Sequence, residues 1–363
     1  MAFRERRIDV ESQFAERRGG RSLQTLFGQN QLSSTRVGTS ETTSTVPFQS
    51  HFFALDLFAF DSRMPSARQT QSFLIRRFAQ VGIEPRTKHG QNFLIDLNLL
   101  ELLFETAQIE RRDVVLEVGT GTGSLTALLA GVAAEVVTVE LDPRMHQLAS
   151  EELIDFENVL LLNQDALRNK NHLNPSVLAA VRERLAASPE RRFKLAANLP
   201  YNVATPVISN LLACDMPPET MTITIQKELA DRIVARPNSK DYGALSVWVQ
   251  SQCEAEIVRI LPPSVFWPRP KVTSAIVQLR LRRDWRDRIP DLDFFHTFSR
   301  SMFFHRRKFL RSVILSGYKG RLDKPQVDAL MAELRFGETI RAEQLDVPTM
   351  LRLCEAIRAR LAV

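Results

Sequence analysis

The sequence predicts an α/β protein in which a mostly parallel sheet carries helices on both faces and a small all-helical region follows. Three observations support this fold class. Apolar strand patterns alternate with helical patterns from residue 114 onward, as in successive βαβ units. Two late strands lie close together without a long helix between them, which predicts an antiparallel hairpin at the sheet edge. Beyond Pro290 every pattern has helical spacing. The predicted strands lie near 114–118, 136–140, 159–162, 193–197, 221–226, 254–260 and 274–281.

Residues 1–66 are predicted to be a disordered N-terminal extension. The first fifty residues are rich in Arg, Ser, Thr, Gln and Gly and poor in aliphatic side chains, a composition that does not build a core. An organelle transit peptide is a competing interpretation, although Glu5, Asp9, Glu11 and Glu16 are unusual for one. A start codon placed too far upstream, with Met64 as the true start, is a third.

Residues 67–283 are predicted to form the sheet domain. A helix over Gln71–Val81 ends at Gly82, a loop covers Lys88–Leu94, and a second helix runs from Asp96 to about Ala107. A further helix is predicted over Ser176–Ala187, between the third and fourth strands.

Residues 290–363 are predicted to form a helical domain behind a linker, Arg282–Pro290, which is charged and ends in proline. Leu292–Leu315 places phenylalanines on one side at helical spacing and arginines on another. Shorter helices are expected near 324–335 and 347–361, the last with Asp346 as its N-cap.

Composition excludes several classes of function. The 363 residues carry 48 Lys and Arg against 42 Asp and Glu, a net charge of +6, and the basic residues gather at 280–288 and 300–311. Such clusters indicate either a nucleic-acid surface or solvated helix faces. The three cysteines match no zinc or redox spacing, which predicts buried thiols in a reducing cytoplasm. The six histidines form no ligand cluster, and no segment approaches a membrane span, so neither a metal site nor a membrane partner is expected.

A glycine-rich turn follows the first predicted strand. Gly119, Gly121 and Gly123 permit positive φ and close approach of a ligand to the backbone. Glu140 ends the next strand, where an acid suits the ribose hydroxyls of an adenosine-containing cofactor. Asp165 follows the third strand at the same edge. Taken alone, the glycines also fit a nicotinamide or flavin dehydrogenase.

The tetrapeptide Asn198-Leu199-Pro200-Tyr201 follows the fourth strand. It places an amide, a proline and an aromatic ring at the edge where ligands bind in open α/β sheets. A dehydrogenase does not need this tetrapeptide, whereas an enzyme that methylates an exocyclic amine does.

With these motifs in order, the chain from about Thr70 onward resembles the ribosomal RNA adenine N6,N6-dimethyltransferases. The strings that carry the resemblance are Gly90-Gln91-Asn92-Phe93-Leu94, Glu117-Val118-Gly119-Thr120-Gly121, Val139-Glu140-Leu141-Asp142, Gln164-Asp165-Ala166, Asn198-Leu199-Pro200-Tyr201-Asn202, Gln226-Lys227-Glu228, Pro237-Asn238-Ser239-Lys240, Pro262-Pro263-Ser264-Val265-Phe266, Pro270-Lys271-Val272 and His305-Arg306-Arg307-Lys308. The resemblance implies a Rossmann-like S-adenosylmethionine-dependent methyltransferase sheet with a closing antiparallel hairpin. Asn169–Arg192 is longer than is usual in this family.

The resemblance also implies roles for single residues. The Asn198 side-chain oxygen and the Leu199 carbonyl would accept the hydrogens of the target amine, and Pro200 would hold that carbonyl in place. Tyr201 would stack on the target base and Phe266 would cover its other face. The residues expected to bind S-adenosylmethionine are Asn92 and Leu94, which close over it, Gly119 and Gly121 beside its methionine part, Glu140 at its ribose, Asp165 at its adenine amine, and Asn198.

Arg306, Arg307 and Lys308 are expected to contact RNA phosphates, together with Arg269 and Lys271 beside Phe266. A solvated helix face remains the alternative for each, and His305 stands where the family has a neutral amide or a similar residue. The implied reaction is dimethylation of two adjacent adenines near the 3′ end of small-subunit rRNA, on a pre-30S particle, by a monomeric cytoplasmic enzyme. The alternatives are a large-subunit rRNA adenine methylase of the macrolide-resistance type and a non-catalytic ribosome-assembly factor.

Overall fold

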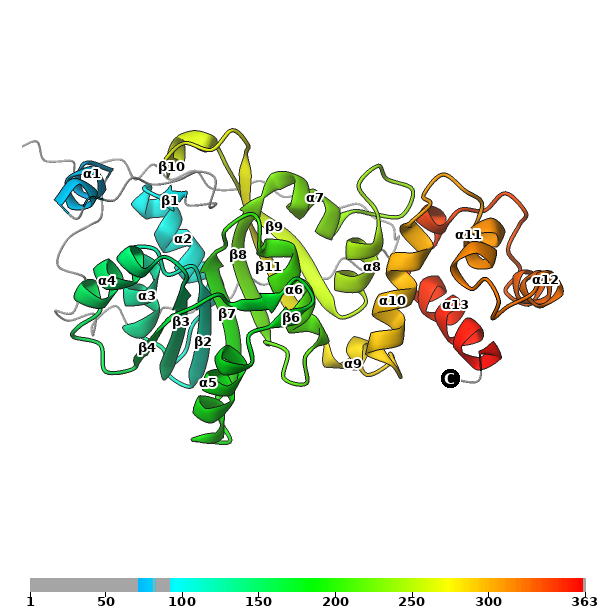
Figure 1. Ribbon diagram of the computed structural model, residues 1–363, viewed down its shortest axis with the longest axis horizontal. Helices are drawn as coiled ribbons and strands as arrows, with labels where there is room; N and C mark the ends of the chain where they lie inside the picture. Colours follow the sequence, from blue (N-terminus) through cyan, green and yellow to red (C-terminus); the bar gives the residue numbers. More distant parts are fainter. Residues whose placement is uncertain (1–70, 81, 83–91, 362–363) are drawn as a thin grey trace, which may run out of the picture. The chain divides into compact units, whose positions relative to one another are not determined.

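The computed structural model describes residues 71–80, 82 and 92–361. The predicted extension over 1–66, the last residue of the helix predicted over Gln71–Val81 and most of the loop predicted over Lys88–Leu94 lie outside the described residues. Within them, the alternation of strands and helices is the one that the sequence predicts (Figure 1).

The centre of the fold is a seven-stranded sheet with the order β4-β3-β2-β7-β8-β11-β9. The first five strands in this order are parallel, and β11 pairs antiparallel with both β8 and β9. The closing hairpin is therefore confirmed, with β9 at the edge. The strands are β2 (Asp113–Val118), β3 (Glu135–Glu140), β4 (Val159–Asn163), β7 (Arg192–Asn198), β8 (Thr220–Gln226), β9 (Cys253–Leu261) and β11 (Ser274–Leu281).

Two apolar layers cover the sheet because successive strand residues point to opposite faces. Val115 of β2 is buried with the helices α2 and α3, whereas Val114 and Leu116 are buried with α5 and α6 on the other face. The helices of the sheet region are α2 (Leu97–Ala107), α3 (Ser124–Ala130), α4 (Pro143–Glu152), α5 (Pro175–Ala186), α6 (Ala204–Ala213), α7 (Lys227–Val234) and α8 (Ala244–Gln250). The helix predicted over Ser176–Ala187 is α5, preceded by a short hairpin of β5 (Leu167–Asn169) and β6 (His172–Leu173).

The N-terminal described segment packs against α4 and pairs with β10, two contacts that the sequence did not predict. Helix α1 (Gln71–Gln80) buries Leu74 and Phe78 against Met145 and Leu148 of α4, and Gly82 follows with φ +64°. Strand β1 (Phe93–Leu94) pairs antiparallel with β10 (Phe266–Trp267), which follows the short 3-10 helix η2 (Pro263–Val265). Two motifs far apart in the sequence are thereby joined.

The helical region consists of α10 (Leu292–Phe303), α11 (Leu310–Gly317), α12 (Lys324–Glu333) and α13 (Val347–Arg360), with the short helix η3 (Ala342–Gln344). Asp346 caps α13 as expected, because its carboxylate accepts from the Thr349 amide. The single helical pattern over Leu292–Leu315 is broken at 304–309, where the amide of Leu310 donates to the carbonyl of Ile340 at 2.8 Å. The chain must turn here to reach that partner.

The predicted linker is docked on the sheet region. It contains helix α9 (Arg283–Arg286), and the Arg286 guanidinium donates to the carbonyls of Leu212 and Cys214 and to the Gln252 side chain. Buried side chains of the sheet and of the helical region share one apolar cluster, so the boundary between the two predicted domains stays a prediction.

Cys253 and Cys354 are buried, as expected for structural thiols, and Cys214 is partly buried. The described part of the chain contains no group of three His, Cys, Asp or Glu side chains placed to hold a metal ion. No helix in that part is long and apolar enough to cross a membrane.

Candidate cofactor and target-amine site

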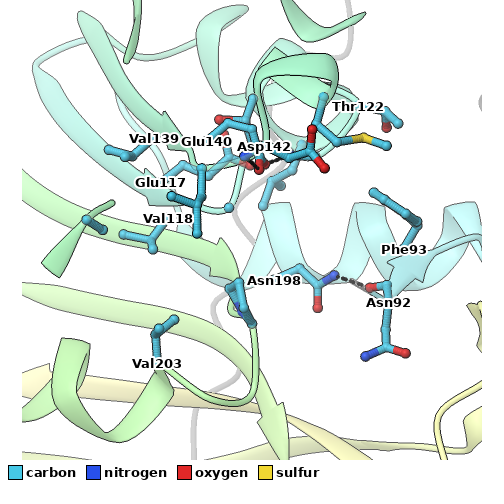
Figure 2. A pocket seen from close by; sticks show the side chains of 18 of the residues that line it. Asn92, Phe93, Glu117, Val118, Thr122, Val139, Glu140, Asp142, Asn198 and Val203 are labelled. Carbon is cyan, nitrogen blue, oxygen red and sulfur yellow. Dashed lines mark hydrogen bonds between the residues drawn. The ribbon is translucent and has the colours of Figure 1, made fainter. Parts of the chain in front are cut away.

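A cavity of about 510 Å³ opens at the carboxyl ends of β2, β3 and β7 (Figure 2). This is the edge at which open α/β sheets bind ligands. All seven predicted cofactor residues line it together with Pro200, namely Asn92, Leu94, Gly119, Gly121, Glu140, Asp165 and Asn198. The sequence motifs therefore converge on one site.

The glycine turn forms a wall that a side chain would obstruct. Gly119 has φ +87° and Gly121 has φ +58°. A Cβ on Gly119 would lie 3.1 Å from the ring of Pro200, and one on Gly121 would lie 3.2 Å from the ring of Phe93. Glycine is needed at both positions because the backbone is left-handed there and the neighbouring rings occupy the space.

Glu140 is fixed beside this turn, with 8% of its surface exposed. One carboxylate oxygen accepts from the Gly121 amide and the other from the Asp142 amide, both at 2.9 Å. Burial raises the pKa of the Glu140 carboxyl, while these amide donors act in the opposite direction. Each oxygen keeps acceptor capacity, since a carboxylate has about four lone-pair sites.

Asp165 and Gln164 occupy the turn after β4. The Oδ1 of Asp165 accepts from the Leu167 amide at 2.9 Å and so shapes the turn. The Gln164 amide oxygen accepts from the Ser176 hydroxyl at 3.0 Å, while its buried Nε2 has no hydrogen-bond partner. Gln164 was not predicted as a site residue. Its place between a strand end and Asp165 was the available signal.

The side-chain amide of Asn198 is held by the N-terminal segment. Its Nδ2 donates to the carbonyl of Asn92 at 3.0 Å, as Figure 2 shows. This bond orients the amide with its nitrogen toward Asn92 and leaves the Oδ1 to accept. Leu199 is 2% exposed, and its amide donates to the carbonyl of Thr224 at 3.2 Å. The Pro200 carbonyl accepts from the Val203 amide at 3.1 Å, which fixes the turn.

The two aromatic residues expected to stack on a base do not line the cavity. The Tyr201 hydroxyl lies 2.6 Å from the hydroxyl of Ser274 on β11, and burial raises the pKa of the Tyr201 phenol. Phe266 is only 2% exposed, because β10 pairs with β1 and its ring packs among the buried residues beneath. Phe266 therefore has no open face here, and the stacking role of both rings stays a prediction.

Glu117 lines the cavity and was not predicted as a site residue. It is 1% exposed and accepts from the hydroxyls of Thr126 and Thr138. Burial raises the pKa of this carboxyl to about 8, even though both hydroxyl donors lower it. The signal was a carboxylate inside an otherwise apolar strand, two residues before the glycine turn.

Comparison with known proteins agrees with this geometry. The family described as ribosomal RNA adenine dimethylase matches residues 83–356. The ribosomal RNA small subunit methyltransferase A of Listeria innocua is 38% identical over 276 residues, which are 75% of this chain and 90% of that protein. The Streptococcus mutans protein of the same name is 36% identical over 270 residues, which are 74% of this chain and 90% of that protein.

The chain belongs to the ribosomal RNA adenine dimethylase family. Solved structures agree in fold. A dimethyladenosine transferase from Plasmodium falciparum has a TM-score of 0.61 at 24% identity, covering 73% of this chain and 97% of that one. The 23S rRNA methyltransferase ErmE has a TM-score of 0.51 at 26% identity, covering 73% and 99%.

The basic residues expected to meet RNA fall into two groups in this family member. Arg269, Lys271, Arg307 and Lys308 are exposed, and no ion pair within the described chain engages them. Arg306 differs. Its guanidinium pairs with Glu343 and donates to the carbonyls of Ser239 and Lys240. Arg311 likewise pairs with Asp328. Both side chains therefore have carboxylate or carbonyl partners within the fold, and the expected RNA contact of Arg306 stays a prediction.

Proposed function

We propose that the cavity binds S-adenosylmethionine and that Asn198 and Leu199 present the exocyclic amine of a target adenine to it. As a member of its family, the chain is an rRNA adenine dimethyltransferase. The proposed reaction adds two methyl groups to each of two adjacent adenines near the 3′ end of small-subunit rRNA. The observation that carries this proposal is the Asn198 amide, whose oxygen is the free end beside the cavity.

The residues around the cavity fit this cofactor. The part of the cavity lined by Gly119 and Gly121 would take the methionine part, and the Glu140 carboxylate has acceptor capacity for the two ribose hydroxyls. The buried Nε2 of Gln164 has no hydrogen-bond partner, although buried polar groups are normally paired. It could donate to a ring nitrogen of the cofactor's adenine. When bound, the cofactor supplies an electrophilic methyl group on a sulfonium.

The work of the chain is positioning. An adenine amine is a poor nucleophile because its lone pair is delocalised into the ring. If the Asn198 Oδ1 and the Leu199 carbonyl both accept its hydrogens, the lone pair is freed from the ring and aimed into the cavity. Orientation and fixed dipoles of this kind account for large parts of enzymatic rate enhancements. Methyl transfer leaves a positively charged nitrogen that loses its proton readily to water, so the chain need not supply a strong base.

The substrate is proposed to be a pre-30S particle, acted on by a cytoplasmic monomer. Relatives that are 36–39% identical are named for the small subunit. Similarity to ErmE at 26% identity makes the large subunit the second candidate.

Methyl transfer to purified subunits separates the candidates. With labelled S-adenosylmethionine, we expect the chain to label small subunits that lack dimethyladenosine and to leave large subunits unlabelled. Labelling of the large subunit alone would favour the ErmE-like activity. Labelling of neither would favour an assembly factor without catalysis.

Calorimetry tests the cofactor assignment separately. Glu140→Ala removes a charged acceptor, and a hydrogen bond to a charged group contributes about 1.5–3 kcal/mol. We expect the dissociation constant for S-adenosylmethionine to rise at least tenfold, and Glu140→Gln to have a smaller effect because it keeps one acceptor oxygen. An unchanged constant for Glu140→Ala would remove Glu140 from the proposed site.

A further inference from the structure

A second cavity, of about 380 Å³, lies between α10 and α11. Its lining includes Arg300, Phe304 and His305 on one side and Val313 and Gly317 on the other. These elements do not contribute to the cofactor cavity. The volume is within the range of about 300–1,000 Å³ that small-ligand sites occupy.

Phe304 stands out at the mouth of this cavity. It is 80% exposed, the largest value among the large apolar side chains of the described chain. Its neighbours behave differently, because Phe303 packs edge-on against Tyr242 at 5.9 Å and Phe298 is 1% exposed. The break between α10 and α11 turns Phe304 away from this core. Its ring and the His305 ring form a T-shaped pair with centroids 4.9 Å apart, and most of the Phe304 side chain remains exposed.

The charges around the cavity are positive. Arg300 lines it, and Arg307 and Lys308 lie in the same turn as Phe304. All three are exposed, and none forms an ion pair with the described residues. The neighbouring Arg306 and Arg311, by contrast, are held by Glu343 and Asp328. No acidic side chain lines the cavity.

We propose that this cavity takes one unpaired nucleotide of the rRNA substrate, with its base on Phe304 and its flanking phosphates at Arg300 and Arg307. An exposed aromatic face combined with free cations is the combination that binds single-stranded nucleic acid. Unstacked bases of RNA loops are recognised in this way. The inference rests on the proposed rRNA substrate. The site holds the RNA at a distance from the reacting amine and contributes to affinity, not to the chemical step.

Binding to small subunits that lack dimethyladenosine, measured without S-adenosylmethionine, tests the site. Loss of one stacked base weakens binding roughly fivefold to a hundredfold, so we expect this range for Phe304→Ala. Phe304→Leu keeps the apolar bulk and should also bind weakly, whereas Phe304→Trp keeps a stacking face and should bind like the wild type. Ile154→Ala is the matched control, because Ile154 is 79% exposed and lies outside both cavities.

Salt dependence separates stacking from phosphate contacts. Phe304→Ala should weaken binding equally at all salt concentrations, whereas Arg307→Ala should make the slope against salt shallower. The inference is overturned if Phe304→Ala or Phe304→Leu binds subunits as tightly as the wild type. It is also overturned if Phe304→Ala abolishes self-association of the chain but leaves RNA affinity unchanged, because the occupant is then a second copy. Wild-type chain that binds subunits but transfers no methyl group would instead count against the proposed function alone.

Discussion

The side-chain amide of Asn198 acquires its orientation from a residue more than a hundred positions earlier. The carbonyl of Asn92 accepts from the Nδ2 at 3.0 Å, so the oxygen is the end that can meet the target amine. The sequence predicted the acceptor role of Asn198, but not this partner. The pairing depends on tertiary contacts that bring the N-terminal motif over the sheet edge, and no local pattern encodes them.

Asn198→Ala should lower the turnover number for methyl transfer by about a hundredfold or more, the usual cost of one oriented polar group in a transition state. The dissociation constant of S-adenosylmethionine should change far less, because the cofactor has its other partners. Single-turnover kinetics on small subunits with calorimetry alongside provides both numbers. A turnover number close to that of the wild type would refute the assigned role.

Glu117 makes the stability of the folded chain depend on pH. Burial raises the pKa of its carboxyl from 4.5 to about 8, so the folded chain binds a proton that the unfolded chain releases between these values. The free energy of unfolding must therefore fall as pH rises through this window, by at most about 1.4 kcal/mol per pH unit.

Glu117→Gln removes this titration, so the stability of this variant relative to the wild type should rise from pH 5 to pH 8. Urea unfolding at several pH values measures this, with Glu157→Gln at an exposed position as the control. A parallel pH dependence for wild type and Glu117→Gln would contradict the burial argument.

At the scale of elements, the loop between α7 and α8 is fastened to the helical region. The Arg306 guanidinium holds the carbonyls of Ser239 and Lys240, the amide of Asn238 donates to the carbonyl of Glu343 at 2.8 Å, and the Tyr242 hydroxyl donates to the carbonyl of Leu345 at 2.8 Å. The break between α10 and α11 places Arg306 where it can do this. Arg306 thus acts as a clamp between the helical region and a loop of the sheet region.

Arg306→Ala should lower the free energy of unfolding by about 1 kcal/mol or more, because it leaves two carbonyls and a carboxylate without their donor. The estimate is no higher because the Arg306 side chain is partly exposed to solvent. Amide hydrogen exchange over residues 236–242 should accelerate. Arg307→Ala, the adjacent exposed arginine, should change stability by less than about 0.5 kcal/mol. Equal effects of the two substitutions would show that the clamp contributes nothing.

The elements differ in how far the sequence determines them. The strands, the closing hairpin and α5 were predicted, because periodicity and apolar runs are local signals. The break after Phe303, the pairing of β1 with β10 and the docked linker were not, because each depends on a distant partner. The glycines, Glu140 and Asp165 were correctly predicted to lie at one edge of the sheet, because each follows a strand that the local pattern predicts. The burial of Phe266 and the ion pair of Arg306 were not predicted, because both depend on residues far away in the sequence.

For the molecule as a whole, the cofactor cavity is covered by segments that precede the sheet. Leu74 of α1 lines it and is 2% exposed, and Phe78 packs edge-on against Phe93 of β1 at 5.2 Å. Helix α1 rests on α4, whose Met145 also lines the cavity. Cofactor binding should therefore depend on α1, whereas none of the described residues before Leu74 lines the cavity.

Two truncations test this dependence. A chain that begins at Met64 should keep full methyl transfer, because it retains α1 and every described residue that lines the cavity. A chain that begins at Gly82 should bind S-adenosylmethionine at least several-fold more weakly, because it exposes Met145 and Leu148. Calorimetry on both chains is the measurement. Weak binding by the longer chain would show that residues 1–63 contribute to the site.

The most direct test of the account is mass spectrometry of nuclease-digested rRNA from cells with the gene, without it, and with the Asn198→Ala form. We expect N6,N6-dimethyladenosine in small-subunit rRNA only when the intact gene is present, at two adjacent adenines near the 3′ end. The account is contradicted if small-subunit dimethyladenosine is the same in all three strains, or if the modification that disappears belongs to the large subunit.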